Sequence, residues 1–139
     1  MAAVPNPGAN MAAAVEAEYA NFRDLQEQMA KDKSDLQTLL GQQNENEMVK
    51  QELEYLDDSS NVYKLVGPVL MKNDLDDAKM TVSKRLEFIN GEISKLEKKV
   101  STKEKKATEI AQKVQEMQGA MQQAAVAAAQ QAAAAAQSS

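Results

Sequence analysis

The feature that most constrains this chain is a regular series of apolar residues, spaced alternately four and three apart, across residues 75–128. A repeat that averages 3.5 residues keeps its side chains on one side of a left-handed supercoil. The segment therefore predicts a long helical rod that lies against a second helix, which disfavours most enzyme folds. Only Lys79 and Lys103 interrupt the series, whose apolar members are Leu75, Val82, Leu86, Ile89, Ile93, Leu96, Val100, Ala107, Ile110, Val114, Met117, Met121, Ala124 and Ala128.

The composition excludes several kinds of chemistry. The chain has no Cys and no His, so disulfides, thiolate nucleophiles, Cys/His zinc sites and histidine general bases are ruled out. Two carboxylate pairs, Asp57 with Asp58 and Asp76 with Asp77, are the remaining candidates for an enzyme site. They lie where helices are expected to end or begin, and capping explains them. We therefore predict no catalytic, cofactor-binding or metal-binding residue and no enzyme activity.

The ends of the chain favour a protein that stays in the cytosol, with nuclear presence left open. No apolar run approaches the ~18 residues that a membrane span needs, so we expect no membrane partner. Residues 1–10 hold two prolines and no basic residue, unlike a secretory or transit peptide. We expect a disordered leader there, and a low-complexity tail in the Ala- and Gln-rich residues 124–139, although alanine also favours helix.

A first helix is predicted over residues 11–58, where no proline forces a break. Phe22, Leu25, Met29, Leu36 and Leu39 share one heptad frame, whereas Val49, Leu53 and Leu56 fit another. We therefore expect the frame to shift across residues 41–47, which have no apolar series.

A β-hairpin is predicted over residues 61–72, between the first helix and a second over residues 74–123. β-Branched and aromatic residues flank a Gly67–Pro68 turn signal, and Pro68 cannot continue a helix. Asp74 or Asn73 is expected to cap the second helix, because either side chain can accept hydrogen bonds from first-turn amides. The predicted fold is mostly α: a long antiparallel coiled-coil hairpin with one small β-hairpin at its closed end.

Both faces of the predicted β-hairpin are largely apolar. Val62, Lys64 and Val66 alternate with Tyr63 and Leu65, and the second strand alternates likewise. A lone two-stranded hairpin is marginal in water, and open apolar edges pair with other strands. We infer that several such hairpins close into a shared sheet, so the chain is an obligate subunit of an oligomer. The alternative is an irregular loop packed on the coiled coil.

Charge is unevenly divided along the chain. Residues 1–60 carry 12 acidic and 4 basic side chains, and residues 61–139 carry 9 acidic and 12 basic ones. The lysine-rich residues 95–113 suggest a nucleic-acid patch as one interpretation. We favour a solvated helix face that complements the acidic arm, and we predict no nucleic-acid partner.

The sequence around the turn resembles that of the β-type subunits of prefoldin. The resemblance covers about residues 36–117 and lies in the helix that precedes the hairpin, the coiled coil that follows it, and the series Asn61, Val62, Tyr63, Lys64, Leu65, Val66, Gly67, Pro68, Val69 and Leu70. It implies a heterohexamer of two α-type and four β-type subunits, whose hairpins build a double β-barrel from which the coiled coils extend. The residues carried over to that platform are Val62, Tyr63, Leu65, Val66, Val69, Leu70 and Met71.

The resemblance also implies a function that needs no ATP or other cofactor. A prefoldin captures unfolded chains, notably actin and tubulin, and transfers them to the cytosolic group II chaperonin. The absence of a P-loop pattern agrees with this. The expected partners are thus other prefoldin subunits, unfolded clients and the chaperonin. A non-chaperone coiled-coil scaffold is the alternative, and it would not need a hairpin with two apolar faces.

Substrate capture is predicted at the open ends of the two helices. Methionine suits surfaces that adapt to many partners, and several methionines lie there. The alternative for each residue is that it only closes the coiled coil. The predicted clamp residues are Tyr19, Phe22, Leu25, Met29, Ile110, Val114, Met117 and Met121.

Overall fold

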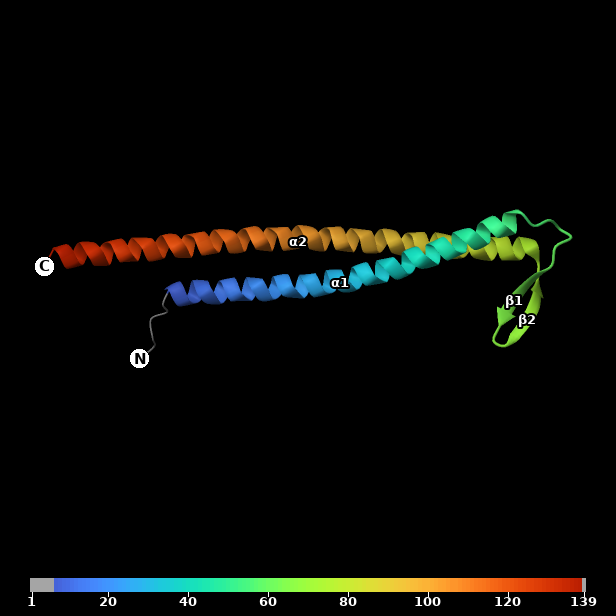
Figure 1. Cartoon of the computed structure of the whole chain (residues 1–139), viewed down its shortest axis with the longest axis horizontal. Coiled ribbons are helices and arrows are strands. Elements are labelled where there is room, and N and C mark those ends of the chain that lie inside the picture. Colours follow the sequence, from blue (N-terminus) through green and yellow to red (C-terminus); the bar gives the residue numbers. More distant parts are fainter. Residues whose placement is uncertain (1–6, 139) are drawn as a thin grey trace. The chain divides into compact units, whose positions relative to one another are not determined.

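The computed structural model describes residues 7–138, which form two long helices and one small sheet (Figure 1). The order is α1 (Pro7–Glu54), β1 (Val62–Val66), β2 (Val69–Asn73) and α2 (Leu75–Gln137), and the strands pair antiparallel. The predicted mostly helical fold with one β-hairpin is confirmed. The chain divides into two compact units. We call Lys31–Val100 the hairpin unit, and the described part of Met1–Ala30 with Ser101–Ser139 the terminal unit.

The hairpin unit has a narrow apolar core where α1 ends and α2 begins. Leu53 of α1 packs with Leu75, Ala78, Val82 and Leu86 of α2, and all five are buried. Farther along α2, Ile89 and Ile93 are also buried. These α2 positions, except Ala78, belong to the predicted series, so the four-three spacing correctly located the face that α1 covers.

The start of α2 is set by Asp74. Its carboxylate accepts a hydrogen bond from the Asp76 amide at 3.2 Å, and its carbonyl accepts one from the Ala78 amide at 2.9 Å. Asp76 and Asp77 occupy the first turn, where negative charge interacts favourably with the helix dipole. Asp74 is therefore the N-cap, as the sequence indicated.

The strands meet at a two-residue turn, Gly67 and Pro68. Gly67 has a φ of 58°, a left-handed conformation that suits glycine at the first central position of a type II′ hairpin turn. The register pairs Val66 with Val69, Leu65 with Leu70, and so on to Val62 with Asn73. The predicted β-hairpin is therefore present, and the alternative of an irregular loop is excluded.

The predicted shift of the heptad frame in α1 is wrong. α1 is continuous from Pro7 to Glu54, and burial keeps the four-three spacing through Leu39, Gln43, Asn46, Lys50 and Leu53. Gln43 donates a hydrogen bond to Asn90 of α2 at 2.6 Å. Polar side chains thus hold the inward positions where the sequence shows no apolar series, whereas Val49 and Leu56 are exposed.

The helix ends also differ from the predicted ones. α1 ends at Glu54 rather than residue 58, because Asp57 accepts hydrogen bonds from the Ser59 amide at 3.0 Å and from the Ser59 and Ser60 hydroxyls. This local turn competes with helix. Of the predicted leader, residues 1–6 lie outside the described residues and 7–10 are helical. The predicted division into leader, domain and tail stays a prediction.

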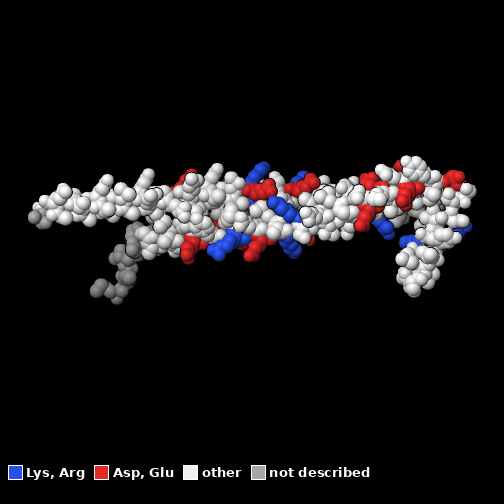
Figure 2. Space-filling view, in the orientation of Figure 1, with Lys and Arg blue, Asp and Glu red and all other residues white. Residues whose placement is uncertain are grey.

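α2 continues far beyond the predicted end at residue 123, to Gln137. Every described residue after Met121 is exposed, including Ala124 and Ala128, so the apolar series is not buried there. Figure 2 shows this end of α2 without charged side chains. Alanine explains the helix by its intrinsic propensity and explains the exposure by its small apolar surface. Among the described residues, no helix is long and apolar enough to cross a membrane.

Candidate interaction surfaces

The first candidate surface is the β-hairpin, whose apolar side chains lie in solvent in the single chain. Leu65 is 68% exposed and its cross-strand partner Leu70 is 65% exposed. Val62 alone is partly buried, because it packs against the helical core. The other predicted platform residues are all exposed, namely Tyr63, Leu65, Val66, Val69, Leu70 and Met71.

The register assigns these side chains to two faces. Cross-strand partners share a face, so Tyr63, Leu65, Leu70 and Lys72 lie on one face. Val66, Val69 and Met71 lie on the opposite face with Lys64 and Val62. Each face therefore carries several exposed apolar groups, and each strand has one unpaired edge within the described chain. Such a sheet can be completed by other strands and by apolar surfaces on both sides.

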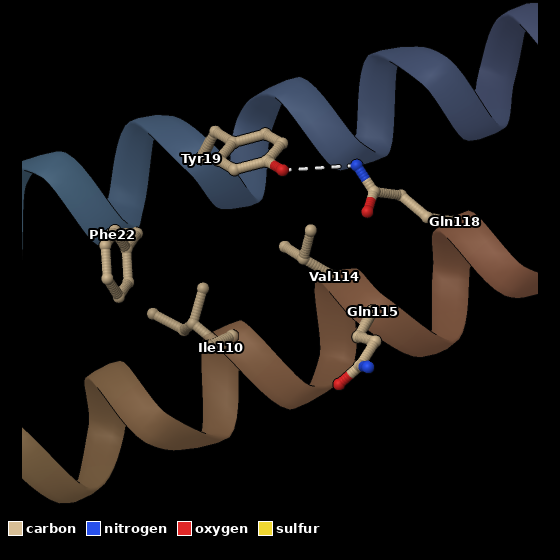
Figure 3. Close-up of a pocket in the computed structure, with 7 residues that line it drawn as sticks. Tyr19, Phe22, Ile110, Val114, Gln115 and Gln118 are labelled. Atoms are coloured by element: carbon tan, nitrogen blue, oxygen red, sulfur yellow. Dashed lines mark hydrogen bonds between the residues drawn. The ribbon is translucent and has the colours of Figure 1, made fainter.

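The second candidate surface lies in the terminal unit, where α1 and α2 run side by side. An open hollow of about 280 Å³ lies between them, and Figure 3 shows the residues that line it. Four predicted clamp residues line it: Tyr19, Phe22, Ile110 and Val114. The other four, Leu25, Met29, Met117 and Met121, are half-buried and do not line it. Val114 is buried, so its main contribution is to the helix pair.

Polar contacts join the two helices beside this hollow. The Gln118 amide donates to the Tyr19 hydroxyl at 3.1 Å (Figure 3), and Lys113 Nζ lies 2.9 Å from Glu18 Oε1. Sequence reasoning missed Ala111, Gln115 and Gln118, which line the hollow. Their spacing could have identified two of them. Ala111 lies three residues before Val114 and Gln118 four residues after it, so both lie on the same face of α2 as Val114.

Residues of both carboxylate pairs lie at a turn or at the start of a helix. The Ser59 hydroxyl and amide, followed by the Ser60 hydroxyl, donate hydrogen bonds to Asp57 and lower the pKa of its carboxyl. Asp76 and Asp77 lie in the first turn of α2. Within residues 7–138, no group of three or more acidic side chains is placed to hold a metal ion. Turn formation thus explains Asp57, and the favourable interaction with the helix dipole explains Asp76 and Asp77.

The fold and its surfaces define a coiled-coil protein built for association, with an uncovered β-hairpin and an apolar hollow between helices. A family model described as prefoldin subunit matches residues 16–121. The chain belongs to this family. Relatives include mouse prefoldin subunit 6, 42% identical over 86 residues, which cover 62% of this chain and 68% of the mouse protein. Prefoldin subunit 6 of Arabidopsis thaliana is 51% identical over 53 residues, 38% of this chain and 41% of that one.

Solved structures agree on the fold. The prefoldin beta subunit from Thermococcus strain KS-1 superposes with a TM-score of 0.71 at 23% identity, covering 84% of this chain and 96% of that chain. The beta2 subunit from the same strain gives 0.59 at 18% identity, with 66% and 98% covered. The resemblance to β-type prefoldin subunits is thus confirmed. Members of this family are components of a chaperone complex that assemble with other prefoldin subunits.

Proposed function

We propose that this chain is a subunit of an ATP-independent chaperone that captures unfolded polypeptides of the actin and tubulin class and transfers them to the cytosolic chaperonin. The observation that carries the proposal is the β-hairpin with two exposed apolar faces in a chain of the prefoldin family. A hairpin of this kind gains stability when other strands and apolar surfaces cover it. The active form in this proposal is a heterohexamer in the cytosol.

The seven hairpin residues form the assembly surface in this proposal. Six of them are exposed in the single chain, whereas Val62 joins the sheet to the helical core. This division suits a subunit interface, because one end of the sheet is fixed by its own chain and the rest is free to pair. The residues are Val62, Tyr63, Leu65, Val66, Val69, Leu70 and Met71.

Client capture takes place in the terminal unit in this proposal. The hollow beside Tyr19 and Phe22 is open and mostly lined by apolar side chains, so it fits an apolar side chain of a non-native segment. The Gln118–Tyr19 contact is exposed, and in the pair with Glu18 the Lys113 side chain is 61% exposed, so both contacts add little stability. The helices can thus separate locally, which would expose Leu25, Met29, Met117 and Met121 as further apolar contacts.

The experiment compares two variants in the assembled complex. The clamp variant carries Tyr19→Ser, Phe22→Ser and Ile110→Ser, and the control variant carries Leu40→Ser, Met48→Ser and Val126→Ser, at three exposed apolar positions outside the hollow. We expect the clamp variant to assemble normally by native mass spectrometry but to lose suppression of aggregation of denatured actin. If the clamp variant suppresses the aggregation of denatured actin as well as the unmodified complex does, the clamp residues do not bind the client. Normal assembly after replacement of residues 62–71 by a neutral turn would favour a coiled-coil scaffold.

A further inference from the structure

A continuous furrow follows one flank of the helix pair in the hairpin unit. It consists of three open hollows, of about 330, 650 and 380 Å³. Thr81 and Arg85 line both the first and the second hollow, and Leu39 and Gln42 line both the second and the third. The furrow accompanies α2 from Ala78 to Lys99, which is about 30 Å at 1.5 Å per residue.

The middle of the furrow contains an aromatic side chain that is not buried between the two helices. Phe88 is 69% exposed, whereas its neighbour Ile89 is buried between the helices. Phe88 lines the hollow of about 650 Å³ together with Leu39 and Ile89. A large exposed apolar side chain in a groove is typical of an anchor point for a partner.

The charge of the furrow is opposite to that of the whole chain. The chain has a net charge of −5, yet the basic residues of the furrow outnumber the acidic ones, Asp35 and Glu92. Glu92 is already paired with Lys95 at 3.3 Å. Lys84 and Arg85, which line the same hollow as Phe88, have no ion pair within the described residues. The basic residues are Lys64, Lys84, Arg85, Lys95 and Lys99.

We propose that the furrow binds an acidic amphipathic helix of a partner protein. An apolar side chain of that helix packs against Phe88, and carboxylates on its flanks pair with Lys84 and Arg85. A length of about 30 Å matches a helix of roughly 20 residues, and apolar anchors with flanking charges are typical of helix-in-groove recognition. The site lies wholly within the hairpin unit and does not depend on the proposed client clamp.

The test uses the assembled complex and a fluorescein-labelled 20-residue peptide with one Leu/Phe stripe and Glu on both flanks. Two controls are a scrambled peptide without the stripe and a peptide with Lys in place of Glu. We expect the acidic amphipathic peptide to bind at least about tenfold more tightly than either control by fluorescence anisotropy. Phe88→Ala should weaken binding of the acidic peptide about tenfold. Lys84→Gln with Arg85→Gln should weaken that binding at low salt and reduce its dependence on salt.

Met80→Ala is the matched control, because Met80 is an exposed apolar residue of α2 that lines none of the three hollows. It should leave peptide binding unchanged, and Phe88→Ala should leave capture of denatured actin unchanged. Equal affinity for the amphipathic and scrambled peptides, or no effect of Phe88→Ala, would overturn the proposal. A photo-crosslinker at position 88 that reacts in the complex with a sister subunit alone would also overturn it, since the furrow would then be a subunit interface.

Discussion

The helical core and the β-hairpin of the hairpin unit are built from the same aliphatic residue types, yet their exposure is opposite. Leu86 in the core is 4% exposed, whereas Leu65 in the hairpin is 68% exposed. In the hairpin unit, α2 has one apolar stripe, and α1 covers it. The two-stranded sheet has two apolar faces and two edges, and one helix pair cannot cover them all. The single chain therefore buries its helical core by itself but leaves the apolar side chains of its sheet exposed.

The largest effect is expected when the hairpin is made polar without changing its backbone. Leu65→Thr with Leu70→Thr replaces a cross-strand pair by residues that also favour strands. If other subunits bury this pair, assembly should lose roughly 3 to 6 kcal/mol, from about 1.5 to 3 for each leucine. Native mass spectrometry of the co-expressed subunits should then show no hexamer. An intact hexamer would mean that the hairpin is not an assembly surface.

The matching change in the core should affect stability instead of assembly. Leu86→Ala removes a buried side chain and should lower the free energy of unfolding by about 2 to 5 kcal/mol. Leu40→Ala, at an exposed position of α1, should cost less than about 1 kcal/mol. Thermal unfolding followed by circular dichroism would measure both. Equal effects at the two positions would show that Leu86 does not lie in a packed core.

Replacing glycine by alanine should have opposite effects on stability in the hairpin turn and in α2. Gly67→Ala forces alanine into a left-handed conformation and should destabilise the hairpin by about 1 to 2 kcal/mol. Gly91→Ala, in the interior of α2 with open space around it, should stabilise the helix by up to about 1 kcal/mol. Chemical denaturation of the two variants should give shifts of opposite sign. Shifts of the same sign would contradict the turn conformation.

The terminal unit should respond only weakly to loss of the ion pair between Lys113 and Glu18. Lys113→Gln removes the contact with Glu18, and the lysine side chain is 61% exposed. The expected cost is below about 1 kcal/mol and should shrink in high salt. Thr108→Gln, on the same helix, serves as the control that keeps the pair. A large, salt-independent loss of stability would show that this contact is more than a surface pair.

The smallest effect is expected at the turn after α1. Hydrogen bonds from Ser59 and Ser60 lower the pKa of Asp57. A lowered folded-state pKa means that the charged carboxylate favours the folded turn above the unfolded-state pKa. This contribution is lost as pH falls through the folded-state pKa. NMR titration should give a lower pKa for Asp57 than for the Ser59→Ala, Ser60→Ala variant. Equal values would exclude these hydrogen bonds in solution.

The apolar residues allowed most of the fold to be predicted. The inward face of α2 up to Met121, the strand alternation and the Gly67–Pro68 turn each have a local signal that the structure confirms. The errors come from polar and small residues. Gln43 and Asn46 lie at inward positions because α1 is continuous and its apolar residues before and after them, Leu39 and Leu53, fix the register. A pattern of apolar residues alone does not show that. The furrow beside Phe88 combines residues from both helices, so it becomes visible only after folding.

Hydrogen–deuterium exchange of the hairpin peptide, residues 62–73, measured in the isolated chain and in the complex of co-expressed subunits, tests whether other subunits cover the hairpin. We predict rapid exchange in the isolated chain and strong protection in the complex, because strands of neighbouring subunits then form hydrogen bonds with the backbone amides on the open edges of the hairpin. The core peptide, residues 82–93, should be protected in both. A hairpin that is equally protected in the isolated chain, or that remains unprotected in the complex, would contradict the account.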